Sequence, residues 1–182
     1  MIAPVLRGSR VVLRGLKVSD RAGRQRWGWD QEIERGYGHA SDTRAMTDDE
    51  ADAWFDAATS RQGENAWMIE ISGELAGVTS LHSLSQPDRK ARFAIGMFAF
   101  EFLGHGYGTE ATALVLRHAF ESLNLHRVDL RVLAFNDRAI ASYRKCGFRQ
   151  EGRERESCWL EGNWHDDIIM GVLSDDYTAL FR

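Results

Sequence analysis

The sequence feature that most constrains the fold is a glycine-rich loop between a strand-like and a helix-like segment. The loop, residues 103–109, has glycine at positions 104, 106 and 108. Residues 91–98 before it have strand character, and from Thr109 onward apolar residues recur on one stripe, which predicts a helix of about 14 residues. Glycine permits positive φ and close approach of a ligand, and the free N–H groups of a first helical turn attract anions. The unit predicts a phosphate site, with a tight structural turn as the alternative.

The glycine spacing separates three kinds of phosphate-binding loop. The dinucleotide fingerprint G-x-G-x-x-G is not matched, because Gly104, Gly106 and Gly108 each stand two positions apart and no βαβ unit precedes them. The P-loop pattern G-x-x-x-x-G-K-S/T does not occur in the chain. The remaining interpretation is a cradle for the pyrophosphate of coenzyme A.

Length and composition indicate one globular domain over residues 1–182. The chain has 43% apolar residues and a net charge of −4, a combination that excludes a disordered chain. It has no apolar run near the roughly 20 residues that span a bilayer and no signal-peptide pattern, so we expect a cytoplasmic protein without a membrane partner. Cys146 and Cys158 have no metal-site spacing and are expected to be free thiols.

The rest of the chain alternates between strand and helix patterns. Ser19 and Asp20 are a predicted N-cap pair, and Thr47 and Glu50 form a capping box. Asn136 and Asp137 precede a short helix that Gly147 closes. The predicted strands are 10–16, 65–72, 76–84, 91–98 and 126–135, with a hairpin around 161–163. The predicted helices are one over about 21–37, one that follows Thr47 and includes Trp54, Phe55 and Ala58, one of about 14 residues from Thr109, and a short one from Asp137 to before Gly147. These elements predict an α/β protein with a mixed sheet.

Residues 103–155 are locally basic, with nine Lys or Arg against six Asp or Glu, although the whole chain is acidic. This excess is too small for a surface that binds duplex nucleic acid, so we expect no nucleic-acid partner. It suits a small ligand with several phosphates, and a solvated charged face is the alternative.

Two motifs resemble the GNAT superfamily of acyl-CoA-dependent N-acetyltransferases. LGHGYGTEA, residues 103–111, stands where that family has its Q/R-x-x-G-x-G/A motif, and NDRAIASYRKCGF, residues 136–148, is similar to the second cofactor segment. The resemblance covers about residues 10–177 and is closest to the branch that acetylates the N-termini of ribosomal proteins. It implies a GNAT-type α/β fold, a mixed central sheet of about seven strands with about four helices, and strands splayed at the cofactor site.

The resemblance also implies a set of binding residues for acetyl-CoA. The main chain of Met97 and Phe98 would pair with the pantetheine arm, Asn136 would bind that arm through its side chain, and Ser142 would lie beside it. A helix cap is the alternative role for Asn136. Backbone N–H groups would hold the pyrophosphate, from Leu103, Gly104, His105, Gly106, Tyr107, Gly108 and Thr109.

Tyr143 is the catalytic residue that the resemblance implies, with a purely structural aromatic as the alternative. The departing CoA thiolate needs a proton, and a phenol with a pKa of ~10, against ~8.5 for a thiol, stays protonated and can donate one. A backbone N–H near Phe98 would stabilise the negative charge on the carbonyl oxygen. No metal is required.

The general base is not identified by the sequence. Residues 91–98 contain no carboxylate, although many relatives have one there, and Arg92 is the only charged residue of that strand. A water chain is one possibility, and side-chain candidates are His82, Glu32, Glu34 and Glu70. Leu103 replaces the usual Gln, Arg or Trp, and Phe100 stands where Pro is common. A catalytically impaired CoA-binding or regulatory module is therefore the alternative function.

The acceptor is expected to be a primary amine, either a small molecule or a peptide N-terminus. In this family the substrate contacts come from the first two helices and the terminal hairpin, here residues 27–44 and 160–165. Aromatic walls with carboxylates favour a cationic amine, and packing of the helices is the alternative role of the aromatic residues Trp27, Trp29, Tyr37 and Trp164. A homodimer is a possible assembly.

Overall fold

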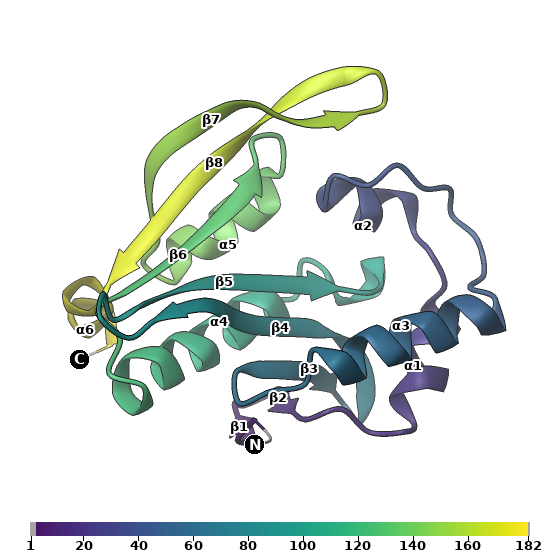
Figure 1. Cartoon of the computed structure of the whole chain (residues 1–182), viewed down its shortest axis with the longest axis horizontal. Helices are drawn as coiled ribbons and strands as arrows, with labels where there is room; N and C mark the ends of the chain where they lie inside the picture. Colours follow the sequence, from purple (N-terminus) through teal and green to yellow (C-terminus); the bar gives the residue numbers. More distant parts are fainter. Residues whose placement is uncertain (1–2, 182) are drawn as a thin grey trace.

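An eight-stranded mixed sheet runs through the computed structural model, which describes residues 3–181 (Figure 1). The strand order is β1-β2-β3-β4-β5-β6-β8-β7, and among these described strands only β5 and β6 pair in parallel. The strands are β1 (Leu6–Arg7), β2 (Val11–Arg14), β3 (Ala66–Ile71), β4 (Glu74–Ser85), β5 (Lys90–Met97), β6 (Arg127–Leu133), β7 (Arg149–Leu160) and β8 (Asn163–Leu173). The predicted α/β class and mixed sheet are confirmed. The strand beyond the expected seven is β1, whose two residues are too few to show an alternating pattern.

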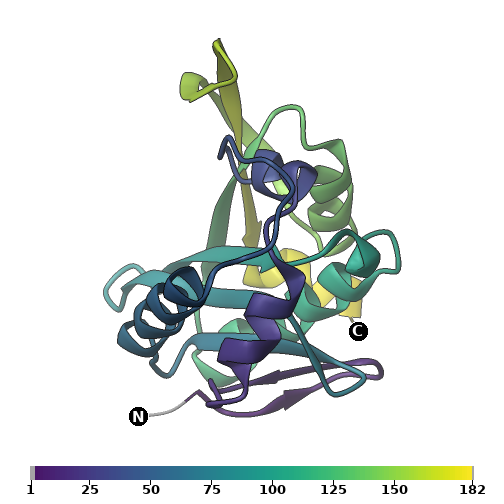
Figure 2. The ribbon, with the colours of Figure 1, turned by 90° about the vertical axis from the view of Figure 1, so that its right-hand side faces the viewer.

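Helices cover both faces of the sheet. Figures 1 and 2 show α1 and α3 on one face and α4, α5 and α6 on the other. The helices of residues 3–181 are α1 (Asp20–Trp27), α2 (Gln31–Gly36), α3 (Asp48–Ser60), α4 (Tyr107–Arg117), α5 (Asp137–Lys145) and α6 (Ser174–Phe181). Six α-helices therefore stand where about four were expected, and α4 continues as a π-helical turn over His118–Ser122.

The helix predicted over 21–37 is instead two helices, and Gly28 is the reason. Its φ of 64° lies in the left-handed region, so the chain leaves the α-helical path after α1. Trp29 then pairs with Arg44 through two backbone hydrogen bonds of 2.8 and 3.0 Å. Asp30 begins α2 by accepting the N–H of Ile33 at 3.0 Å.

Two of the predicted helix N-caps are present in the structure, and the one at Ser19 is not. The Thr47 and Glu50 capping box of α3 is present, and Asn136 caps α5. Ser19 makes no capping hydrogen bond through its side chain, and the neighbouring Asp20 is buried and bound to Arg14. A carboxylate that looks like a helix cap in the sequence therefore belongs to a buried ion pair.

One apolar core joins the sheet to the helices behind it, with Trp67 and Leu116 among its fully buried members. Cys146 is buried, Cys158 is half-buried, and both are free, as predicted. In the span from residue 3 to 181, no helix is long and apolar enough to cross a membrane.

The strands β5 and β6 separate after a short parallel contact. They pair only at Lys90 with Arg127, Ala91 with Val128 and Arg92 with Asp129. Beyond that point they diverge toward α2 (Figure 1). The predicted splay is confirmed, and it divides the sheet into an N-terminal part, β1 to β5, and a C-terminal part, β6 to β8.

Candidate active site

A cavity of about 550 Å³ lies where β5 and β6 diverge. The two strands, the glycine-rich loop with the start of α4, and α5 contribute most of its lining. The rest of the described lining comes from α2 and the residue after it, from the turn before the loop and from β8: Ile33, Gly36, Tyr37, Phe102 and Asp167. Its position at the open end of a parallel strand pair is typical of ligand sites in α/β proteins.

The glycine-rich loop presents a row of free backbone donors. Gly104 and Gly106 have φ values of 79° and 82°, which allow the turn into α4. Among the described residues, the N–H groups of positions 104–109 have no acceptor, whereas the N–H of Leu103 donates to Phe100 O at 2.9 Å. The row adjoins the N-terminus of α4, where the helix dipole also favours negative charge. The loop therefore fits a phosphate group.

An ion pair behind the loop holds it in place. Arg10 donates from Nη1 to His105 O at 2.9 Å, and its Nε contacts Glu110 Oε2 at 3.2 Å. Its guanidinium also lies 5.0 Å from the centre of the Tyr107 ring.

Arg138 and Lys145 of α5 line the cavity and give it positive charge.

Tyr143 lies in the wall of the cavity with only 9% of its surface exposed. Its ring meets Phe93 edge-on at a centroid distance of 6.2 Å and Phe148 at 5.8 Å. Burial raises the pKa of Tyr143 above its ordinary 10.0, and Tyr37 and Cys146 raise it further. Within residues 3–181 its hydroxyl has no hydrogen-bond partner, so a protonated phenol is available to a ligand.

Asn136 and Ser142 also line the cavity, and both have partners within the protein. Asn136 accepts the N–H of Ala139 at 3.2 Å through Oδ1 and donates from Nδ2 to Gly36 O at 3.2 Å. Ser142 Oγ lies 2.8 Å from Thr109 Oγ1. Asn136 therefore caps α5 and also fixes the end of α2, and its predicted contact with a cofactor arm stays a prediction.

The hydroxyl of Tyr37 occupies both main-chain groups of Met97. It accepts the Met97 N–H at 2.6 Å and donates to Met97 O at 3.0 Å. Burial of the hydroxyl raises the pKa of Tyr37 to about 12, although 41% of the residue surface is exposed, because only the hydroxyl end enters the protein. The Phe98 N–H donates to Ala76 O at 2.9 Å and is not free to stabilise an oxyanion.

Most of the predicted site residues meet in this cavity. Its lining includes Met97, Leu103, Gly104, Gly106, Gly108, Thr109, Asn136, Ser142 and Tyr143. Phe98, His105 and Tyr107 do not line it. Contacts of these residues with a ligand remain predictions.

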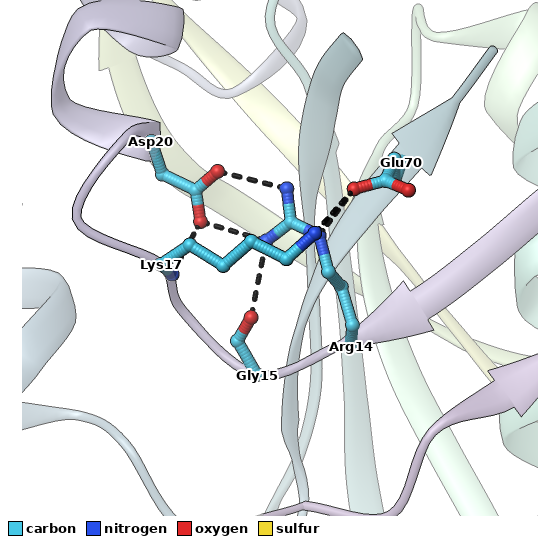
Figure 3. Close-up of polar contacts among 5 residues, drawn as sticks. All are labelled: Arg14, Gly15, Lys17, Asp20 and Glu70. Carbon is cyan, nitrogen blue, oxygen red and sulfur yellow. Dashed lines mark hydrogen bonds and ion pairs between the residues drawn. The ribbon is translucent and has the colours of Figure 1, made fainter. Parts of the chain in front are cut away.

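Glu70, one of the four candidate bases, lies away from the cavity. Figure 3 shows its carboxylate bound to Arg14, at 2.5 Å from Nε, and to Lys17, at 3.1 Å from Nζ. The Arg14 guanidinium also binds Asp20 through two nitrogens at 2.7 and 2.8 Å. The hydrogen bond from Arg14 lowers the pKa of Glu70, and that from Lys17 lowers it further. Glu70 is therefore part of an ion-pair network between β2, β3 and α1.

The other candidate bases also do not line the cavity. His82 is exposed on β4, with Nδ1 3.1 Å from Ser83 Oγ. Glu32 is exposed, and Glu34 is buried with its carboxylate 3.2 Å from His39 Nδ1.

The four charged residues of the described lining were not identified as site residues from the sequence. Arg131, Arg138, Lys145 and Asp167 face the cavity from β6, α5 and β8. Side chains alternate between the two faces of a strand, so the sequence alone indicates that Asp166 and Asp167 of β8 point to opposite faces. The pairing of β8 with β6, which sets Asp167 opposite Leu133, was not visible in the sequence.

Comparison with known proteins agrees with this geometry. A family model described as "Acetyltransferase (GNAT) domain" matches residues 10–149. The chain is 32% identical over 125 residues to spermidine N(1)-acetyltransferase of Escherichia coli K12, which covers 69% of this chain and 67% of that protein. It is 21% identical over 105 residues to [ribosomal protein uS5]-alanine N-acetyltransferase of the same organism, covering 58% of this chain and 54% of that protein.

The crystal structure of spermidine N-acetyltransferase from Vibrio cholerae in complex with CoA and spermine is also similar. It superposes with a TM-score of 0.75 at 25% identity and covers 94% of this chain and 99% of that one. The fold, the glycine-rich loop and the similarity to these acetyltransferases together indicate an α/β enzyme that transfers an acyl group. The chain belongs to the GNAT acetyltransferase family, which confirms the predicted superfamily and the predicted N-acetyltransferase class.

Proposed function

We propose that the protein transfers the acetyl group of acetyl-CoA to a cationic primary amine by direct attack of the amine on the thioester. The observation that carries the proposal is the row of free N–H donors at 104–109 beside a cavity that contains Tyr143. A relative crystallised with CoA and spermine supports the same choice of donor and of acceptor class.

Each part of the cavity has a role in this proposal. The loop N–H groups hold the pyrophosphate, and Arg138 and Lys145 add positive charge near it. Bound acetyl-CoA supplies an acetyl group activated as a thioester. Tyr143 Oη donates a proton to the departing sulfur, since burial keeps this phenol protonated at neutral pH. The proposal needs no metal, and that part also stays a prediction.

The acceptor side supports an amine with positive charge, although its aromatic residues differ in their roles. Trp27 donates to Leu75 O at 2.7 Å and packs edge-on against Phe102 at 4.9 Å, so it has a structural role. Tyr37 lines the cavity, and Trp164 is 58% exposed at the tip of the β7–β8 hairpin. Spermidine is the first acceptor to test because of the relative at 32% identity, and a peptide with N-terminal alanine is the second.

Calorimetric titration with acetyl-CoA tests the donor, with desulfo-CoA and NAD as comparison ligands. We expect saturable binding of acetyl-CoA and none of NAD, followed by release of CoA thiol when spermidine is added. Absence of acetyl-CoA binding would contradict the proposal. Binding without thiol release on either acceptor would favour the alternative function, a catalytically impaired CoA-binding module. The predicted homodimer is a separate question, answered by light scattering in solution.

A further inference from the structure

Asp167 stands out among the residues that the mechanism above does not use. It is the only carboxylate among the described residues that line the cavity. It is half-buried, and within residues 3–181 its side chain makes no hydrogen bond or ion pair. The other charged residues in the wall are the cations Arg131, Arg138 and Lys145, so Asp167 is the group of the described lining that can receive a cation from a ligand.

Strand register shows on which face of the sheet Asp167 lies. It pairs with Leu133 of β6, and two residues before it His165 pairs with Cys158 of β7, so these four side chains share one face. Cys158 Sγ lies 3.8 Å from Gly38 O in the loop that follows α2. This face is therefore the one that α2 and its loop cover.

The preceding residue, Asp166, lies on the opposite face of the sheet. Its carboxylate binds Arg153 Nη1 at 2.7 Å and accepts the N–H of Glu156 at 2.8 Å. Two adjacent aspartates of one strand therefore have different environments. Asp166 is engaged by the hairpin, and Asp167 faces the cavity.

The charged groups near Asp167 leave it available to a ligand. Glu154 stands opposite it on β7, and Arg131 of β6 binds Glu154 at 2.7 Å. His165 is engaged with Phe135, at a ring distance of 4.9 Å. The other titratable or charged groups of the cavity come from the end of α2 and from α5: Tyr37, Arg138, Tyr143 and Lys145.

We infer that Asp167 binds the ammonium group of the acceptor and accepts its proton. This inference rests on the proposed function. One Asp167 oxygen takes a proton from R–NH₃⁺, and the lone pair of the resulting amine forms the C–N bond. The C–S bond breaks, and Tyr143 Oη gives its proton to the sulfur. The nitrogen of the new amide still carries two protons at this point, and it gives one of them to the Tyr143 oxygen. The proton held by Asp167 passes to solvent. An ammonium ion and acetyl-CoA thus give an acetamide, CoA thiol and one proton.

Asp167→Asn tests the inference, with Asp166→Asn as the matched control one residue away. We expect kcat/KM for spermidine at pH 7.5 to fall by about 10²- to 10⁴-fold in D167N. The Kd for acetyl-CoA should stay at the wild-type value, which also shows that the variant is folded. The deficit should shrink as the pH rises, because more of the amine is then deprotonated without the enzyme. Asp166→Asn should keep kcat/KM within about threefold of wild type.

Each outcome decides the question. Equal activity of D167N and wild type would overturn the inference and leave the proposed function intact. Parallel loss of acetyl-CoA binding, or an equal loss in D166N, would also overturn it, because Asp167 would then have a structural role. A deficit that does not change with pH would overturn the proton-accepting role. Failure of the wild type itself to bind acetyl-CoA would instead contradict the proposed function.

Discussion

Burial of Tyr143 bears directly on the proton-donating role proposed for it. We expect Tyr143→Phe to lower kcat by about 10²- to 10⁴-fold, because the variant removes the proton donor and keeps the ring in its aromatic cluster. The Kd for acetyl-CoA should not change. Steady-state kinetics and calorimetry measure the two quantities. A variant that keeps wild-type kcat would show that the sulfur takes its proton from another group.

The raised pKa of Tyr143 also determines how turnover depends on pH. A group whose pKa lies above its ordinary 10.0 stays protonated below that value. Deprotonation of Tyr143 should therefore not lower the wild-type kcat between about pH 7 and about pH 9. Any decline of kcat in that range should occur in Tyr143→Phe as well. A descending limb near pH 8 that this substitution removes would contradict the assignment.

Tyr37 presents a different prediction, because its hydroxyl holds both main-chain groups of Met97. A pantetheine arm that pairs with Met97 must displace this hydroxyl. Tyr37→Phe should therefore bind acetyl-CoA about 3- to 10-fold more tightly, since a net hydrogen bond is worth about 1 kcal/mol. Without ligand, the Met97 amide of the variant should exchange with deuterium faster than in wild type. Weaker binding would mean that Tyr37 is part of the donor site.

Site residues within one contiguous segment could be predicted from the sequence, and those brought together by tertiary contacts could not. The donors at 104–109 are backbone groups of one contiguous loop, so glycine spacing and the following helix were sufficient. Tyr143 was identified by resemblance to the family motif. Asp167 reaches the cavity only because β8 pairs with β6, and such pairing between segments over 30 residues apart has no local signal. The contact of Tyr37 with Met97 joins α2 to β5 and was invisible for the same reason.

At the scale of elements, the break between α1 and α2 depends on Gly28. A Cβ at this position would lie 2.5 Å from Arg44 O, and the φ of 64° disfavours any other residue. Gly28→Ala should therefore lower the free energy of unfolding by about 2–4 kcal/mol. Gly63→Ala is the control, because a Cβ there meets no atom within 4 Å, and should change it by less than about 0.5 kcal/mol. Urea denaturation measures both. An equal effect of the two variants would contradict a special role of Gly28.

Elements with a strong local pattern were predicted, and those defined by packing were not. The β3–β4 hairpin and α3 have alternation, a turn or a capping box within their own residues. The two-residue β1 exists because it pairs with β2, and Tyr177 of α6 packs against Phe120 at 5.1 Å. The predicted single helix over 21–37 was wrong because Gly28 and the pairing of Trp29 with Arg44 redirect the chain. Tertiary contacts therefore determine β1, α6 and the break between α1 and α2, none of which was predicted.

At the scale of the whole molecule, the cavity lies at the junction of the two parts of the sheet. Three residue pairs join β5 to β6 at that junction. Within the N-terminal part, the network of Arg14, Asp20 and Glu70 joins the end of β2 to β3 and to the start of α1 (Figure 3). Arg14 and Asp20 are 7% and 2% exposed, so water weakens their attraction little.

This network makes the stability of the molecule depend on pH in a definite direction. The folded protein lowers the pKa of Glu70 below its ordinary 4.5, so the stabilisation by Glu70 is fully present above that value and is lost as the pH falls through the folded pKa. At pH 7, Glu70→Gln should lower the free energy of unfolding by about 1.5–3 kcal/mol, the range for hydrogen bonds to charged groups. The difference between wild type and variant should shrink below about pH 4.5.

Glu74→Gln is the matched control, because Glu74 forms an ion pair with Arg26 at 2.8 Å in which both side chains are well exposed. It should change stability by less than about 0.5 kcal/mol at any pH between 7 and 3.5. Urea denaturation at pH 7, 5, 4 and 3.5 measures all three proteins. A wild-type advantage over Glu70→Gln that stayed constant down to pH 3.5 would show that the carboxylate charge of Glu70 is not what binds Arg14.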